Sequence, residues 1–219
     1  MHQETTTKEK ILKKVRKALI QKSSSTANID FDSDIYQKAE EPLEIIFAQQ
    51  FTKLNGKFIY CENEKELSEN LSMLMEENKW DNHEKNGEGI FCFENKAKEI
   101  LKKSGIDFSE NEKDVRHVNV GVSLCEFLAA RTGSVLVSSK QTSGRILPAF
   151  ANYHIVIAYS SQLVYTIKEA LGGIKNKYKN DFPSMIVNIS GPSRTADIEK
   201  TLVQGAHGPK EIYVFLVDG

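Results

Sequence analysis

The sequence predicts an α/β fold in which a mostly parallel sheet lies between helices and carries a β-hairpin insertion. Short apolar runs alternate with segments of helical periodicity, from residues 57–61 to a last run at 212–217. This alternation is typical of parallel strands that are covered by helices on both faces. Residues 127–131 and 134–138 are apolar and flank Thr132-Gly133, a pattern that indicates an antiparallel hairpin.

The first half of the chain has the periodicity of three helices and two strands. We expect a helix over 36–54, with Pro42 at its true start or at a kink, because proline fits poorly inside a helix. A strand at 57–61 precedes a helix marked by Leu67, Leu71, Leu74 and Met75, and a strand at 90–93 precedes a helix at 95–104. Gly105 is suited to end that last helix.

The second half predicts a buried strand at 155–159 and a helix at 162–171 that is closed by Gly172-Gly173. Met185, Ile186, Val187 and Ile189 indicate a strand buried on both faces. Gly191-Pro192 then starts a helix, because proline is tolerated in a first helical turn. Ile198 and Leu202 give this helix its apolar face, and Gly205 stops it before the last strand.

Residues 1–22 contain a basic amphipathic helix, in which Ile11, Val15 and Leu19 recur at helical spacing among lysines. Its narrow apolar stripe favours packing on its own domain or on a second copy, which would make the protein a homo-oligomer. Docking on a partner or an acidic membrane surface is the alternative. Ser23–Asp30 is a polar linker. We therefore expect a helical extension at 1–30 and a single α/β domain at 31–219.

Composition excludes several classes of protein. Lys and Arg number 29 against 30 acidic residues, which argues against nucleic acid as the main partner. No run approaches the roughly 20 apolar residues that span a bilayer, and the N-terminus lacks a signal-peptide core, so we expect a cytoplasmic protein. Cys61, Cys92 and Cys125 are far apart, which predicts reduced thiols and no iron–sulfur cluster bound by this chain alone. The histidines show no metal-ligand spacing, so no metal site is predicted.

Polar residues on turns beside the predicted strands are the candidates for a site. Ligands of open α/β sheets bind beyond the carboxyl ends of the strands. Arg145 and Arg194 suit a carboxylate or phosphate, the helix start at Gly191 favours an anion, and His207 is a candidate general acid or base. The alternative for each is a helix cap, a solvated arginine or a hydrogen-bonded histidine of a turn or the core. The candidates are His207 for proton transfer and, for ligand binding, Arg131, Thr132, Gly133, Ser143, Gly144, Arg145, His154, Ser190, Gly191, Ser193, Arg194, Thr195, Asp197, Gly205 and Gly208.

The same residues carry a family resemblance. Arg131-Thr-Gly-Ser-Val135, Ser143-Gly-Arg145, Pro148 with Tyr153-His154, Ser190-Gly-Pro-Ser-Arg-Thr-Ala-Asp-Ile-Glu199 and Gly205-Ala-His-Gly-Pro209 occur in this order. From about Gly121 to its end, the chain resembles the lactate utilization protein C family, which has a LUD domain. The first half resembles it only in its pattern of helices and strands.

The resemblance implies a fold like that of sugar-phosphate isomerases and CoA transferases. It also implies membership of a bacterial three-protein system that oxidises L-lactate to pyruvate, in which partner proteins carry the iron–sulfur clusters. The family usually has glutamate before the threonine-glycine of the hairpin turn, whereas this chain has Arg131. If that carboxylate is catalytic in the family, this member has different chemistry, and it binds a more anionic ligand or serves another pathway.

Three hypotheses follow. The first is a subunit of a lactate-oxidation system that binds a small carboxylate or a phosphate-bearing ligand through Arg145, Arg194 and the turn at Gly191. The second is a non-catalytic assembly or regulatory subunit that docks iron–sulfur partners through its hairpin or its N-terminal helix. The third is a stand-alone enzyme acting on small phosphorylated substrates.

Overall fold

The computed structural model describes residues 7–20, 39–80, 89–111, 118–144, 146–196, 202–204 and 208–218. The chain divides into two compact units between residues 38 and 39. In its described part the first unit is the helix α1 (Thr7–Ile20). Ile11, Leu12 and Val15 of this helix are exposed. None of the helices within these ranges has the length and apolar character needed to cross a bilayer.

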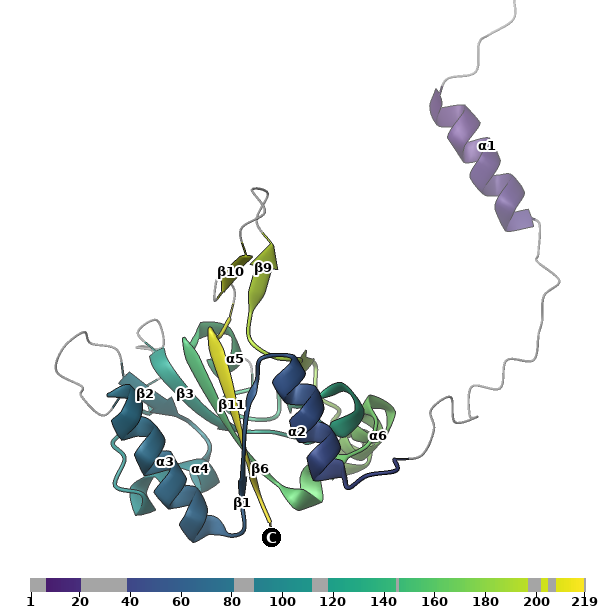
Figure 1. Ribbon diagram of the computed structural model, residues 1–219. Coiled ribbons are helices and arrows are strands. Elements are labelled where there is room, and N and C mark those ends of the chain that lie inside the picture. Colours follow the sequence, from purple (N-terminus) through teal and green to yellow (C-terminus); the bar gives the residue numbers. More distant parts are fainter. Residues whose placement is uncertain are drawn as a thin grey trace, which may run out of the picture. The chain divides into compact units, whose positions relative to one another are not determined.

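The second unit contains alternating helices and strands, followed by a run of short strands (Figure 1). In chain order these are α2 (Leu43–Lys53), β1 (Lys57–Cys61), α3 (Glu64–Asn78), β2 (Gly89–Cys92), α4 (Asn95–Lys103), β3 (Val118–Leu124), β4 (Phe127–Ala129), β5 (Ser134–Ser138), α5 (Leu147–Phe150), β6 (Tyr153–Tyr159), β7 (Leu163–Val164), α6 (Ile167–Tyr178), β8 (Ile186–Ile189), β9 (Arg194–Ala196), β10 (Leu202–Gln204) and β11 (Glu211–Val217).

Five strands form a parallel sheet, sheet A, in the order β1-β11-β6-β3-β2. Its inner strands β6 and β11 are buried along almost their whole length, as expected for parallel strands covered on both faces. Helices α3 and α4 cover one face, and α2 together with a second sheet covers the other (Figure 1). The predicted parallel sheet flanked by helices is confirmed.

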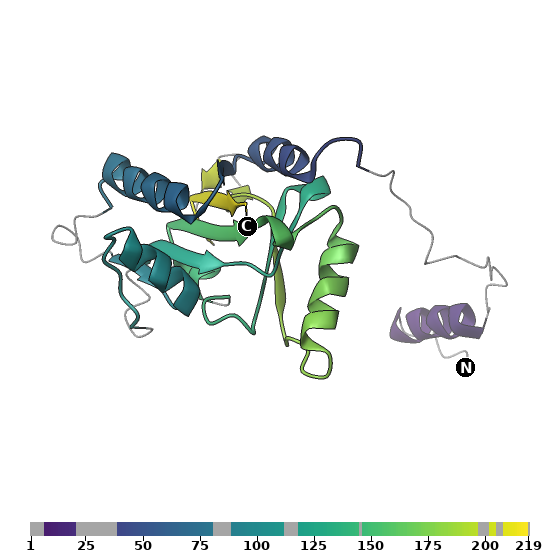
Figure 2. The same ribbon diagram turned by 90° about the horizontal axis from the view of Figure 1, so that it is seen from below.

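The second sheet, sheet B, has the order β7-β4-β5-β8 and contains the predicted hairpin. Strands β4 and β5 are antiparallel, and Gly133 between them has φ 56°, a left-handed conformation that suits glycine. Helix α6 packs against sheet B through Ala170 and Ile174, and Figure 2 shows α6 alongside these strands. The insertion is therefore a separate layer between sheet A and α6.

The strand predicted at 185–189 exists, but its predicted environment is wrong. Strand β8 pairs antiparallel with β5 in sheet B instead of completing the parallel sheet. Asn188 is exposed and its neighbours are only half buried, so the strand is not covered on both faces. An apolar run does not by itself distinguish a central strand from an edge strand.

The helix predicted after Gly191 is wrong. Residues 194–196 and 202–204 are the strands β9 and β10, which pair antiparallel as a two-stranded ribbon that projects beyond sheet A (Figure 1). The backbone N of Ser193 donates to the carbonyl O of Pro209, 2.8 Å away. This bond ties the chain to a segment distant in sequence, and no helical turn starts at Gly191.

The helix predicted at 162–171 is shifted along the chain. Leu163 and Val164 form β7, and α6 begins after Thr166, whose side chain accepts a hydrogen bond from the backbone N of Glu169. The helix continues through both glycines to Tyr178. Gly173 packs against Phe127 so closely that an added Cβ would lie 2.3 Å from the ring, so this glycine serves packing within the helix instead of ending it.

Strand β3, next to the centre of sheet A, was not predicted from the sequence. Gly121 and Ser123 interrupt its apolar character, and both have a packing role. An added Cβ at Gly121 would lie 3.0 Å from Ala151 and 3.1 Å from Leu147, so any larger residue would push α5 away from the sheet by a few tenths of an ångström. Ser123 is buried against His154.

Candidate functional site

The loops that carry several candidate residues meet at the amino edge of sheet A, where its parallel strands begin. One is the turn 130–133 between β4 and β5, another follows β8 at Ser190, and a third precedes β11 at Gly208. The expectation that the site lies beyond the carboxyl ends of the parallel strands is therefore wrong for Gly208, which precedes a strand of sheet A. It is also wrong for His154, the second residue of β6.

A row of hydroxyl groups links two of these loops. The Oγ atom of Ser134 lies 2.8 Å from Oγ1 of Thr132 and 2.9 Å from Oγ of Ser190. The side-chain amide of Asn188 donates to Ser190, with a separation of 3.3 Å. Hydroxyl groups both donate and accept hydrogen bonds, so the exposed Ser190 can bind an oxygen-rich ligand while the buried Ser134 holds it in place. Ser134 is not among the candidates that the sequence indicates, although it directly follows Thr132-Gly133.

The two glycines of these loops lie against the C-terminal end of α2. Gly133 has φ 56°, and a Cβ there would lie 2.5 Å from the backbone N of Phe51. Gly191 has φ 87°, and its Cβ would lie 2.6 Å from the carbonyl O of Leu54. Both positions therefore require glycine for conformation and for space.

Arg194 also contacts this helix end. Its guanidinium donates to the carbonyl O of Leu54 at 3.1 Å. A cation is favourable at a helix C-terminus, where unsatisfied carbonyl groups make the potential negative. Arg194 thus has a capping role in the structure, and its role as an anion ligand stays a prediction.

Ser193 and Gly208 lie next to each other and close to Pro148 of α5. A Cβ at Gly208 would lie 3.4 Å from Cβ of Ser193 and 3.5 Å from the carbonyl O of Pro148.

Several candidates lie outside the described residues. These are His207, which directly precedes Gly208, and also Arg145, Asp197 and Gly205. Thr195 is part of β9, but its side chain is not described. The backbone N of Arg131 donates to the carbonyl O of Tyr165 at 2.9 Å.

Ser143 lies in a different environment from the hydroxyl row. Its backbone N donates to the carboxylate of Glu94 at 3.2 Å, and its hydroxyl donates to the same carboxylate. Glu94 is buried two residues after the end of β2, and this burial raises its pKa although Ser143 partly offsets the effect. Gly144 is also sterically required, because its Cβ would overlap the carbonyl O of Ser138.

His154 is a buried neutral imidazole. Its Nε2 lies 2.8 Å from Oγ of Ser123, and both residues are almost fully buried. Among the described residues, Nδ1 has no hydrogen-bond partner. Burial lowers the pKa of His154 from 6.5 to about 4, so the ring is uncharged near neutral pH and offers an anion no positive charge.

The buried histidine should make the stability of the protein depend on pH. The unfolded state takes up a proton as the pH falls below 6.5, whereas folded His154 does so only near 4, so stability should fall across this window. The slope contributed is about 1.4 kcal/mol per pH unit. We expect urea unfolding between pH 7 and 4 to be less pH-dependent in His154→Gln, which keeps a partner for Ser123. If the free energy of unfolding changes with pH by the same amount in both proteins, this prediction is wrong.

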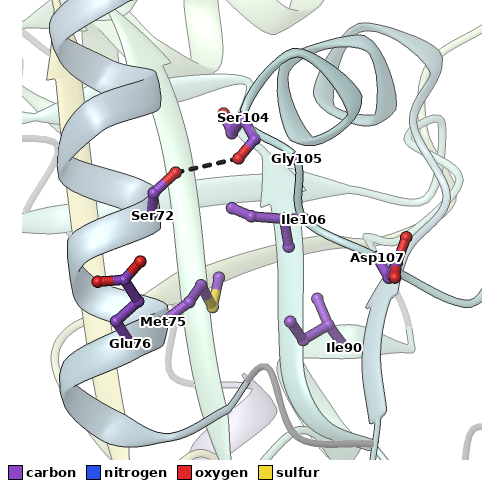
Figure 3. Close-up of a pocket in the computed structure, with 8 residues that line it drawn as sticks. All are labelled: Ser72, Met75, Glu76, Ile90, Ser104, Gly105, Ile106 and Asp107. Carbon is purple, nitrogen blue, oxygen red and sulfur yellow. Dashed lines mark hydrogen bonds between the residues drawn. The ribbon is translucent and has the colours of Figure 1, made fainter.

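A small hollow also lies between α3 and α4, away from the loops described above (Figure 3). It has a volume of about 160 Å³, and Ser72 spans its rim by donating to the carbonyl O of Ser104 at 3.0 Å. Met75, Ile90 and Ile106 point into it. It contains none of the candidate residues.

The described residues include no group of three or more His, Cys, Asp or Glu side chains that could hold a metal ion. Cys61, Cys92 and Cys125 are free and buried. Burial raises the pKa of the Cys92 thiol to about 12, so this thiol is protonated near neutral pH.

This is an α/β protein in which a parallel sheet packs against a mixed second sheet and carries a cluster of polar loops at its amino edge. The chain belongs to the LUD domain family, whose model matches residues 43–217.

Similar proteins agree with this assignment. Lactate utilization protein C of Bacillus subtilis is 36% identical over 112 residues, which are 50% of this chain and 47% of that protein. The protein of the same name from Geobacillus thermodenitrificans is 33% identical over 112 residues, again 50% of this chain and 47% of that protein. The chain thus spans about half the length of the curated relatives it matches.

A solved structure shows the same fold. The crystal structure of a DUF162 family protein from Deinococcus radiodurans aligns with 80% of this chain and 96% of that chain, with a TM-score of 0.57. Its sequence identity is 14%, so this likeness concerns the fold.

Proposed function

We propose that this chain acts in bacterial lactate utilization, as a LUD-domain component that works with iron–sulfur partner proteins and binds a small carboxylate. The similarity to proteins named lactate utilization protein C carries the proposal. The three buried cysteines are fewer than the four thiolates of an ordinary cluster, so the clusters belong on the partners.

The hydroxyl row of Thr132, Ser134 and Ser190 supports a binding site for the carboxylate. Hydroxyl donors recognise carboxylate oxygens, and Arg194 adds positive charge a few residues away in the chain. His207 would transfer a proton at this site, since it directly precedes Gly208, which lies beside Ser193.

Calorimetric titration with L-lactate, pyruvate, nucleotides and CoA esters tests the proposal, with this chain alone and with its partner proteins. We expect L-lactate or pyruvate to bind. Ser190→Ala should make the free energy of binding less favourable by about 0.5–1.5 kcal/mol, the range for one neutral hydrogen bond. Ser184→Ala is the matched control, because Ser184 pairs with Ser139 in an exposed position away from the row. If neither acid binds in any combination, the proposal is wrong.

A non-catalytic assembly subunit is the second candidate. The ribbon β9–β10 projects from the amino edge of sheet A (Figure 1), which is typical of a docking element. Removing residues 1–30 and, separately, shortening the ribbon would show which segment holds the partner proteins. Loss of co-purified partners with carboxylate binding intact would favour this candidate.

A further inference from the structure

Within the described part of the chain, sheet A has an open edge. Strand β1 pairs with β11 on one side, and no other described segment pairs with it. The opposite edge, at β2, is covered, because Ser109 donates from its backbone N to Ile90 and accepts from the backbone N of Cys92, at 2.8 and 3.2 Å. An open strand edge is a template for pairing with another strand.

The direction of the unpaired groups of β1 follows from one hydrogen bond. The backbone N of Asp218 donates to the carbonyl O of Cys61 at 2.9 Å, so Cys61 directs its backbone groups toward β11. Backbone groups alternate in direction along a strand, so those of Phe58 and Tyr60 face away from the sheet. The next outward donor, the backbone N of Glu62, already binds the carboxylate of Glu66.

Hollows lie on both faces of this edge. The one on the α2 side, of about 350 Å³, is mostly apolar and is lined by Glu44, Ile45, Ala48, Phe58 and Tyr60. The one on the α3 side, of about 690 Å³, is mixed: Ile59 and Leu74 contribute to it together with Lys57, Glu77 and Asn78. Figure 1 shows β1 between α2 and α3 at the front of sheet A. Alternate side chains of an added strand would point into one hollow and then the other.

We propose that two copies of this chain associate through β1, antiparallel about a two-fold axis at Ile59, so that their parallel sheets become continuous. In this register Phe58 of each copy lies opposite Tyr60 of the other, and the outward backbone groups of both residues are paired. The two aromatic rings then lie on the α2 face, where Tyr60 is 43% and Ile45 48% exposed in the single chain. Cross-strand aromatic pairs stabilise antiparallel strands.

Charge favours a second copy in this orientation. Partial burial and the nearby carboxylates of Asp218, Glu44 and Glu62 raise the pKa of Tyr60, which shows that the end of the edge near Tyr60 is acidic. The other end carries Lys53 and Lys57, which offset the carboxylates of Glu77 and of Glu211, the partner of Lys57 at 2.7 Å. Antiparallel pairing sets the end with the lysines against the acidic end of the other copy, whereas parallel pairing would set like against like.

Sedimentation velocity of the full chain tests the association directly. We expect a dimer at micromolar concentrations, and at least a tenfold weaker dimer for Tyr60→Lys, which places a charge in the apolar pair. Phe182→Lys is the control, because Phe182 is 49% exposed after α6 and should leave the dimer unchanged. A monomeric native chain at about 100 μM, or a Tyr60→Lys variant that dimerises as well as the native chain, would overturn the proposal.

A cysteine placed at the axis tests the register without relying on disruption. Opposite residues in a non-hydrogen-bonded antiparallel pair are close enough for a disulfide. Under an added oxidant, Ile59→Cys should form a covalent dimer, whereas Tyr60→Cys should not, because Tyr60 faces Phe58 of the other copy. The native cysteines are buried, so the native chain gives the background. Equal cross-linking of the two variants would contradict the register.

Discussion

Replacing Gly133 with alanine should lower the free energy of unfolding by about 2–5 kcal/mol. The left-handed backbone at φ 56° costs an L-residue about 1–2 kcal/mol. The new Cβ would also lie 2.5 Å from the backbone N of Phe51 and 2.7 Å from the carbonyl carbon of Gln50. These are backbone atoms of α2, so no side chain can rotate away, and forcing the atoms apart adds about 1–3 kcal/mol.

Gly105→Ala separates the two contributions. Gly105 has φ 69°, close to that of Gly133, but an added Cβ there meets nothing within 4 Å. Gly105→Ala should therefore lower the free energy of unfolding only through the left-handed backbone conformation, by about 1–2 kcal/mol. Urea unfolding of both variants measures the difference. If Gly105→Ala costs as much as Gly133→Ala, the close approach of the turn to α2 contributes nothing to stability.

The elements that the sequence predicts well are those whose pattern is set locally. Strand β1 and helix α4 follow from apolar spacing, and Pro42 lies at the start of α2, where its carbonyl O accepts hydrogen bonds from the first turn. The turn at Gly133 follows from its threonine-glycine pair. In each case neighbouring residues decide the conformation, so a short window of sequence is sufficient.

The elements that the sequence misses are decided by distant contacts. Gly191-Pro192-Ser193 looks like a helix start, but the bond from Ser193 to Pro209 and the pairing of β9 with β10 give an extended chain. Gly121 looks like a break in a strand, but it marks the approach of Leu147. Neither partner lies within a sequence window around the residue, so periodicity alone cannot identify these elements.

The candidate site shows the same limit. The sequence indicates Thr132 and Ser190 separately, as polar turn residues, whereas Ser134, which joins them, looks only like part of a strand. The charge of Arg194 suggests an anion ligand, but a guanidinium suits a helix carbonyl as well as an anion. Residue type indicates which interactions are available, and only the fold determines which are made.

Glu126 is the second position at which a large effect is expected. Its side chain is completely buried between the hairpin and α6. It accepts hydrogen bonds from Oγ of Ser138 at 2.6 Å, Nζ of Lys177 at 2.7 Å and the hydroxyl of Tyr178 at 2.7 Å. Burial by itself would raise the pKa of this carboxyl, but the three hydrogen bonds outweigh burial and hold the pKa below its ordinary value.

Glu126→Ala should lower the free energy of unfolding by at least about 1.5–3 kcal/mol, the range for one hydrogen bond to a charged group, because three such bonds are lost. The substitution leaves a cavity and removes the acceptor for Ser138 and Tyr178, which anchor β5 and α6 to the same point. Glu69→Ala is the control, because Glu69 makes an exposed pair with Lys65 at 3.7 Å. Exposed pairs contribute little, so this variant should unfold almost like the native chain.

The pH dependence distinguishes the charge of Glu126 from its packing. Because the pKa is lower in the folded than in the unfolded state, the ionised carboxyl stabilises the fold above the ordinary value of 4.5, and this contribution is lost as the pH falls below it. Glu126→Gln preserves most of the volume but cannot ionise. The difference in unfolding free energy between the native chain and Glu126→Gln should therefore be largest near pH 7 and shrink toward pH 3. A difference that stays constant over this range would mean that Glu126 acts through packing alone.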